Sequence, residues 1–159
     1  TDTMATLDTG KKAPSFKLED QDGNQVKLAD FKGRKLLVYF YPRANTSGCT
    51  RQSCAVSDAL PDFGKLGVAA VGISPDMPAS QKKFDDKYEL GFPLLSDPDR
   101  AVARKFGALG LKKVRGVEKE GIIRSSFLID EQGKLAGVWY KVKPEDTVPR
   151  ALETLDSGS

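Results

Sequence analysis

One segment limits the possible folds more than any other: an apolar run at residues 35–40 that ends at Pro42. Its aromatic and β-branched residues, without polar alternation, are typical of a strand buried on both faces. A helix pattern follows, with Thr46 as N-cap and apolar residues at helical spacing up to a stop at Gly64. A second buried strand pattern comes next, at residues 68–73. Buried strands that alternate with a helix predict an α/β fold.

The flanking patterns extend this α/β arrangement. An Asp22-Gly23 turn between two alternating stretches predicts a small N-terminal β-hairpin. The later patterns predict a helix over 80–90, a strand over 92–95, a helix over 101–106, a loop or edge excursion over 108–121, paired strands over 122–129 and 134–142, and a helix starting at Pro144. This order predicts a thioredoxin-like α/β fold with an N-terminal β-hairpin extension.

Length and charge indicate a single soluble unit. The chain has 159 residues, so we expect one domain at residues 13–156 after a flexible segment at residues 1–12. The net charge of +3 arises from mixed signs without a Lys/Arg run, which argues against a nucleic-acid partner. The longest apolar stretch, Leu36 to Tyr41, is far too short for a membrane span. No secretory signal pattern opens the chain, so we expect a cytoplasmic location.

Two cysteines and no histidine restrict the chemistry that the chain can perform. Two thiolates would need carboxylates to complete a zinc site, which is a poor structural set, so we expect no metal. A Cys-His or Ser-His nucleophile pair is impossible because no imidazole is present. A reactive thiol would have to be activated by helix geometry and by arginine or lysine.

The residues around Cys49 indicate such an activated thiol. The predicted helix places Cys49 in its first turn, where free backbone N–H groups and the positive dipole end favour a thiolate. Thr46 lies three residues earlier, close enough for its hydroxyl to reach the sulfur or an incoming oxygen. Gly48 lets backbone and substrate approach closely. Pro42 fixes the preceding turn and shields one side of the thiolate.

The pattern Pro42-x-x-x-Thr46-x-x-Cys49 resembles the active-site signature of the peroxiredoxins. Cys54, five residues further on, resembles the second cysteine of the bacterioferritin comigratory protein, or peroxiredoxin Q, subfamily. Ser47 departs from the pattern, because relatives often carry proline there, so we expect a less rigid turn before the cysteine. The resemblance covers nearly the whole chain through residues 13–16, 22–23, 36–42, 72–74, 92–97 and 124–130.

This resemblance implies a thiol peroxidase that needs no cofactor. Cys49 would attack the terminal oxygen of a hydroperoxide and become a sulfenic acid, and Thr46 would hydrogen-bond the peroxide. Arg124 would hold the thiolate and the developing charge, and Gln52 would position that arginine. Cys54 would resolve the sulfenic acid as an intramolecular disulfide, which thioredoxin or a similar dithiol would reduce. Relatives with an internal resolving cysteine are commonly monomers, so we expect a monomer.

Other interpretations of these residues stay open. Cys54 could be a packing residue on an apolar helix face, Thr46 only a helix cap, and Arg124 a surface ion-pair partner. A thioredoxin-like disulfide oxidoreductase is an alternative function, but its cysteines are normally two residues apart, whereas four residues intervene here. A non-enzymatic adaptor of the same fold would need an exposed apolar patch, which the predicted polar faces do not offer. The sequence selects neither a preferred hydroperoxide nor one reductant.

Overall fold

The computed structural model describes residues 6–157. In chain order its elements are β1 (Lys17–Glu19), β2 (Gln25–Lys27), a 3₁₀ helix η1 (Leu28–Phe31), β3 (Lys35–Phe40), α1 (Ser47–Lys65), β4 (Val68–Ser74), α2 (Pro78–Tyr88), β5 (Leu94–Ser96), α3 (Ala101–Lys105), β6 (Leu109–Val114), β7 (Val117–Ile122), β8 (Ser125–Ile129), β9 (Leu135–Trp139) and α4 (Thr147–Ser157).

Within these residues a seven-stranded sheet has the order β2-β1-β5-β4-β3-β8-β9. The predicted buried strand is β3, which lies parallel to β4 and antiparallel to β8 at the centre of the sheet. The predicted N-terminal hairpin is formed by β1 and β2, which pair antiparallel and add the sheet's outermost strands on that side. The α/β arrangement and the hairpin extension agree with the prediction.

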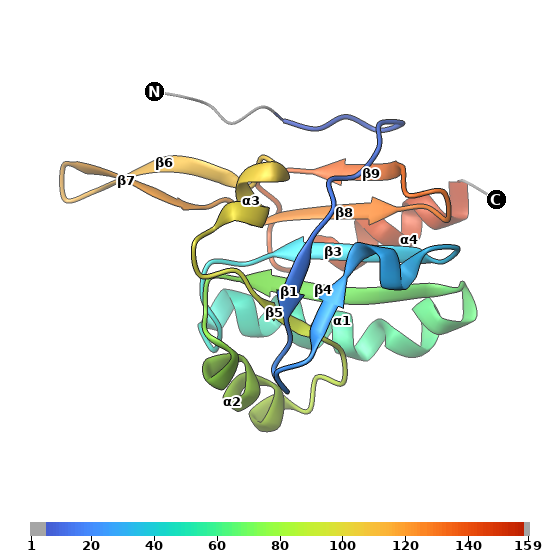
Figure 1. Cartoon of the computed structure of the whole chain (residues 1–159), viewed down its shortest axis with the longest axis horizontal. Helices are drawn as coiled ribbons and strands as arrows, with labels where there is room; N and C mark the ends of the chain where they lie inside the picture. Colours follow the sequence, from blue (N-terminus) through green and yellow to red (C-terminus); the bar gives the residue numbers. More distant parts are fainter. Residues whose placement is uncertain (1–5, 158–159) are drawn as a thin grey trace.

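Helices cover both faces of the sheet (Figure 1). The strand β3 supplies side chains to the core on each face. Leu36 and Phe40 belong to one core with residues of α3. Leu37 and Tyr39 belong to a second core with residues of α1, α2 and α4. Successive side chains of a strand point to opposite faces, which explains why this strand has no polar alternation. The catalytic candidates on α1 therefore lie on the side of the second core.

The segment at 108–121, predicted as a loop or edge excursion, forms the β6–β7 hairpin instead. The two strands pair from Leu109↔Ile122 to Val114↔Val117 and project away from the sheet (Figure 1). Arg115 and Gly116 at the tip both have positive φ, the conformation that a tight hairpin turn requires. An Arg-Gly pair is a weaker turn signal than Asn-Gly, which is why the sequence pattern gave a loop.

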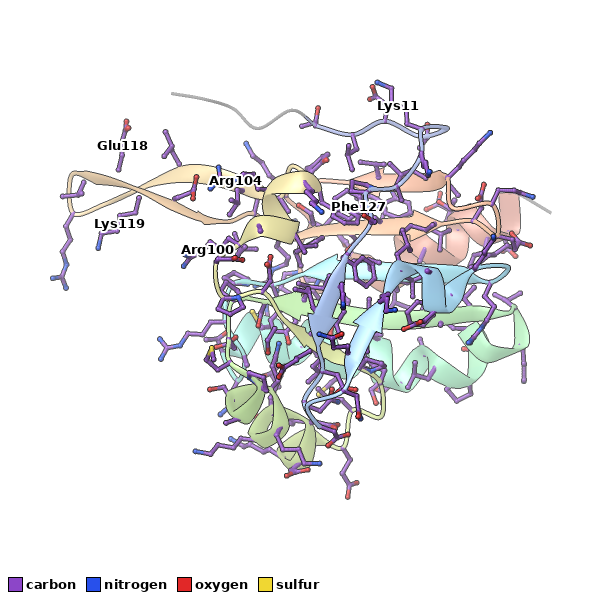
Figure 2. The ribbon with its side chains drawn as sticks, in the orientation of Figure 1. Lys11, Arg100, Arg104, Glu118, Lys119 and Phe127 are labelled. Atoms are coloured by element: carbon purple, nitrogen blue, oxygen red, sulfur yellow. The ribbon has the colours of Figure 1, made fainter. Side chains whose placement is uncertain are left out.

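Figure 2 shows how the hairpin joins the body of the molecule. Glu118 and Lys119 lie out along the hairpin, whereas Arg104 on α3 lies near its base. The Arg104 guanidinium is 2.9 Å from the Glu120 carboxylate, so an ion pair connects α3 to β7. Phe127 lies inside the body on β8, with its ring stacked edge-on against neighbouring aromatic rings.

Several element boundaries differ from the predictions. α1 ends at Lys65, after Gly64, and Gly67 takes the left-handed conformation beyond it. α2 spans 78–88 and not 80–90, because Pro78 occupies its first turn and Glu89 is left-handed. β4, β5 and α3 differ by one or two residues from the predicted 68–73, 92–95 and 101–106.

The largest boundary errors lie near the end of the chain. The strand predicted over 122–129 is interrupted, so Arg124 lies directly before β8 and not inside a strand. The partner strand β9 is shorter than the predicted 134–142. The last helix begins at Thr147 and not at Pro144, because Asp146 provides the first carbonyl acceptor, 3.0 Å from the amide of Arg150. Pro144 lies in the turn before it.

The N-terminal segment contacts β9. Residues 1–5 of the segment predicted to be flexible lie outside the described residues. The Gly10 amide donates to the Leu135 carbonyl at 2.8 Å, and the Leu135 amide donates to the Lys11 carbonyl at 2.8 Å. Lys12 forms an isolated antiparallel bridge with Lys134. These bonds fasten residues 10–12 to the edge of the sheet.

Candidate active site

The loop between β3 and α1 is held by a carboxylate at the end of β4. The backbone amide of Ala44 donates to Asp76 Oδ2 at 2.6 Å, and the Ser74 hydroxyl donates to the same oxygen at 2.7 Å. The buried Gln81 amide donates to Ser74 Oγ at 2.9 Å and accepts from the Tyr41 hydroxyl at 2.6 Å. The chain is therefore anchored to β4 and α2 just before the first turn of α1.

α1 begins where the sequence predicted. Thr46 has extended backbone geometry at the N-cap position, and its carbonyl accepts from the Thr50 amide at 2.8 Å. Its hydroxyl does not cap the helix but donates to the Arg43 carbonyl at 2.9 Å. Pro42 is half-buried in the same loop. The Thr46 hydroxyl donates its proton to the loop, so the lone pairs of Oγ1 are left to accept a hydrogen bond.

Cys49 lies in the first turn of α1, beside the guanidinium of Arg124. The cysteine is 1% exposed, and Arg124 Nη2 lies 3.4 Å from its sulfur. Arg124 Nη1 donates to Gln52 Oε1 at 2.6 Å. The structure thus brings together three predicted site residues from α1 and from the segment before β8. The Cys49 sulfur thus lies at a helix N-terminus with a cation as its direct neighbour.

Gly48 makes room for this arginine. A Cβ atom at this position would lie 3.2 Å from Arg124 Nη2 and 3.3 Å from Cγ of Pro144. Such a contact is tighter than normal van der Waals packing, so a larger residue would push the guanidinium away from the sulfur. In this structure, the groups that closely approach Gly48 are the side chains of Arg124 and Pro144.

Behind the arginine, a chain of buried polar groups continues to α4. Gln52 Nε2 donates to Thr147 Oγ1 at 2.8 Å, and Thr147 Oγ1 lies 2.8 Å from Ser126 Oγ. All three side chains are buried. The sequence did not point to Thr147, because it lies 95 residues after Gln52 and carries no motif of its own. Ser126 belongs to the resembling segment 124–130, but its contact was not predicted.

Cys54 lies one turn further along α1, in different surroundings. It is half-buried at the margin of the second core, and burial, together with the negative charge of Asp58, raises the pKa of its thiol. The preceding residue, Ser53, shares a 2.7 Å hydrogen bond with the hydroxyl of Tyr39, and both side chains are fully buried. Both cysteines are free thiols on one continuous helix.

Other parts of the molecule offer fewer chemical groups. In the described part of the chain, no three or more Cys, Asp or Glu side chains gather as metal ligands would. A shallow cavity of about 270 Å³ is lined by Trp139, Arg150, Glu153 and Thr154, and none of these is a predicted site residue. Among the described residues, no helix combines the length and the apolar character needed to cross a membrane.

Comparison with known families identifies the chain. Residues 9–138 match the sequence model of the AhpC/TSA family. The chain belongs to the AhpC/TSA family. Its curated relatives are peroxiredoxins: Peroxiredoxin Bcp of Bacillus subtilis is 43% identical over 94% of this chain and 96% of that protein. Peroxiredoxin Bcp of Escherichia coli K12 is 48% identical over 88% of this chain and 90% of its own length.

Solved structures agree with this membership. The bacterioferritin comigratory protein of Xanthomonas campestris superposes on this peroxiredoxin with a TM-score of 0.88 at 32% identity, covering 95% of this chain and 99% of that chain. Peroxidoxin BcpB of Mycobacterium tuberculosis gives a TM-score of 0.83 at 31% identity, covering 94% of this chain and 96% of that one. The thioredoxin-like α/β fold is therefore confirmed.

This peroxiredoxin is a thiol peroxidase that acts on peroxides. The predicted resemblance to the bacterioferritin comigratory protein and peroxiredoxin Q subfamily is confirmed by the same relatives. Because the relatives are peroxiredoxins over nearly their whole length, peroxidase activity is preferred over a disulfide oxidoreductase and over a non-enzymatic adaptor.

Proposed function

We propose that this peroxiredoxin reduces hydrogen peroxide and organic hydroperoxides through a sulfenic acid on Cys49. The observation that supports this most directly is the Arg124 guanidinium 3.4 Å from the Cys49 sulfur. The thiolate attacks the terminal oxygen of ROOH, the O–O bond breaks, and RO⁻ takes up a proton to leave as ROH. The X. campestris relative is described with alkyl peroxide reduction activity, which supports organic hydroperoxides as substrates.

Four residues assist this step in the proposed mechanism. Arg124 stabilises the thiolate and the negative charge that develops on the departing oxygen, and Gln52 holds that arginine by the 2.6 Å hydrogen bond. Thr46 accepts a hydrogen bond from the peroxide O–H, because its own proton goes to Arg43. Pro42 shields the thiolate from water on the loop side.

We assign the second step to Cys54. Its thiolate attacks the sulfenic sulfur of Cys49, a disulfide forms, and the sulfenic oxygen leaves as water after taking up a proton. On the intact helix this cannot happen, because five residues rise about 7.5 Å and turn about 140° away from Cys49. A disulfide needs Cα atoms about 4.4–6.8 Å apart with converging Cβ atoms. The first turns of α1 must therefore unwind after oxidation.

The amino-acid composition of this helical segment lowers the free-energy cost of unwinding it. Ser47, Gly48, Thr50 and Ser53 are modest helix formers. We expect hydrogen exchange to show lower protection of residues 46–58 in the disulfide form than in the reduced form. Equal protection in both forms, with the disulfide confirmed by mass, would contradict this account of resolution.

The remaining proposals concern the partners. We propose that thioredoxin or a similar dithiol carrier reduces the Cys49–Cys54 disulfide, and that the protein acts as a cytoplasmic monomer over its domain at residues 13–156. A disulfide near the start of a helix whose turns have opened is accessible to an incoming dithiol. Two cysteines that cycle between thiol and disulfide suit a compartment that keeps thiols reduced.

Intact mass after one equivalent of peroxide tests the proposed function. With a thiol-blocking reagent present afterwards, the reduced protein should lose two hydrogens and accept no alkyl group. Digestion should yield one peptide that links Cys49 to Cys54. A product that keeps two alkylatable thiols, or a disulfide between two chains, would refute the proposed cycle.

A further inference from the structure

Arg124 and Ser126 are two residues apart, yet both are connected to Gln52 by different routes. Arg124 reaches Gln52 directly, through the 2.6 Å hydrogen bond from Nη1 to Oε1. Ser126 reaches it through Thr147, by two contacts of 2.8 Å. These hydrogen bonds, together with the backbone from Arg124 to Ser126, form a closed ring that joins α1, α4 and the start of β8. The ring fixes Arg124 Nη2 beside the Cys49 sulfur.

The Gln52 amide can serve this ring in only one orientation. Its oxygen can only accept a hydrogen bond and its nitrogen can only donate, while a guanidinium can only donate. If the amide rotated by half a turn, two donors would face each other and the arginine would lose its acceptor. Gln52 is fully buried, so bulk water cannot replace a missing partner. The guanidinium therefore selects the orientation with the oxygen toward Arg124, and Nε2 then needs an acceptor on its other side.

That acceptor is the hydroxyl of Thr147. Because Thr147 Oγ1 accepts from Gln52, its proton is available for Ser126 Oγ, 2.8 Å away. Thr147 is fully buried at the first position of α4, so its hydroxyl is held by the helix backbone and by packing. The position of α4 thus provides the acceptor that holds the Gln52 amide in the orientation that Arg124 needs.

We infer that Thr147 is a positioning residue for peroxide reduction, which orients the Gln52 amide so that its oxygen holds Arg124 against Cys49. This inference rests on the proposed role of Cys49. The central test is Thr147→Val, which keeps the shape of the side chain and removes the hydroxyl. The rate of Cys49 oxidation, measured by rapid quench and alkylation, should fall about tenfold or more.

Three further variants separate positioning from packing. Thr147→Ser keeps the hydroxyl and should retain a rate within about threefold of the unmodified protein. Val148→Ala shortens the neighbouring side chain of α4 without touching the ring and should leave the rate unchanged. Gln52→Glu presents an oxygen to Arg124 in either orientation, so adding Thr147→Val to it should cause little further loss. An equal loss in the Gln52→Glu background, or in Val148→Ala, would overturn the inference.

Two other causes of a negative result can be distinguished from an incorrect role of Thr147: a variant that does not fold, and an error in the proposed chemistry of Cys49. If Thr147→Val does not fold, Thr147→Ala replaces it, and an unchanged oxidation rate in Thr147→Ala relative to Thr147→Ser would overturn the inference. The unmodified protein reports on the proposed function, since it must form a sulfenic acid on Cys49. Normal oxidation there combined with an unchanged rate in Thr147→Val would overturn only the role of Thr147.

Discussion

Cys49 and Cys54 lie on one helix, yet their sulfurs have opposite electrostatic neighbours. Cys49 is 1% exposed with the Arg124 guanidinium 3.4 Å from its sulfur. Cys54 is half-buried, and burial with the nearby Asp58 carboxylate raises the pKa of its thiol. The charged neighbour of Cys49 is therefore a cation, and that of Cys54 is an anion. The contrast supports the proposed roles, in which Cys49 attacks the peroxide and Cys54 stays inactive until its surroundings change.

The largest effect is expected from Cys49→Ser. A serine hydroxyl is far less acidic than a thiol, and the chain has no histidine to activate it. Peroxidase turnover should fall to the uncatalysed rate in a coupled assay with reductant in excess. The matched variant Cys54→Ser should still consume one equivalent of peroxide. Substantial turnover by Cys49→Ser would show that the difference between the cysteines has been assigned wrongly.

Arg124→Met should have the next largest effect, because it removes the cation from Cys49 and keeps an apolar side chain of similar length. We expect the rate of Cys49 oxidation to fall by about 10²–10³-fold with the fold intact. Arg124→Lys should recover only part of the rate, since an ammonium cannot contact Cys49 and Gln52 together with the geometry of a guanidinium. Stopped-flow measurement at several peroxide concentrations checks both variants, and an unchanged rate in Arg124→Met would contradict the proposed role.

Cys54→Ser should leave the first oxidation nearly unchanged and block the second step. The sulfenic acid on Cys49 should persist, and excess peroxide should convert it to sulfinic and then sulfonic acid. Mass spectrometry after increasing peroxide should show one, two and three added oxygens. The same treatment of the unmodified protein should stop at the disulfide. Rapid multiple turnover by Cys54→Ser would assign resolution to another thiol, such as one from the reductant.

The smallest effect is expected from Asp58→Asn, which removes the anion near Cys54. A raised thiol pKa means a smaller thiolate fraction at neutral pH, so removing one of its causes should lower the pKa and increase that fraction. In a Cys49→Ser background, alkylation of Cys54 should become about two- to threefold faster at constant pH, because Asp58 is exposed and screened by solvent. The burial contribution should persist, so the pKa should stay above that of a free cysteine.

Local patterns in the sequence were sufficient for the centre of the fold and for the first cysteine. The run at 35–40 became β3 with the predicted bounds, and Thr46 and Cys49 lie where the helix pattern placed them. These features depend on residues that are close in the sequence, so a periodic sequence pattern is enough to predict them. The roles of the cysteines and of Arg124 came from the resemblance, which the local pattern alone could not provide.

Contacts between residues that are far apart in the sequence could not be predicted from the periodic pattern. Arg124 and Gln52 are 72 residues apart, and Thr147 lies 95 residues from Gln52. No periodicity relates such positions, because only the tertiary packing of α1 against α4 and against the segment before β8 brings them together. The hairpin at 108–121 was missed for a local reason: its tip forces positive φ on Arg115, a residue that rarely adopts it.

The anchoring of the loop at Asp76 has a consequence for the unwound state. Ala44 is bound to Asp76 only five residues before Cys49, so the chain on that side of the sulfur has a fixed end. In the resolution step that we propose, the backbone that carries Cys54 therefore covers most of the distance between the two sulfurs. A short tether restricts the volume that the sulfenic sulfur explores, and ring closure over few residues costs little chain entropy. In the proposed cycle, Asp76 thereby raises the local concentration of one sulfur at the other.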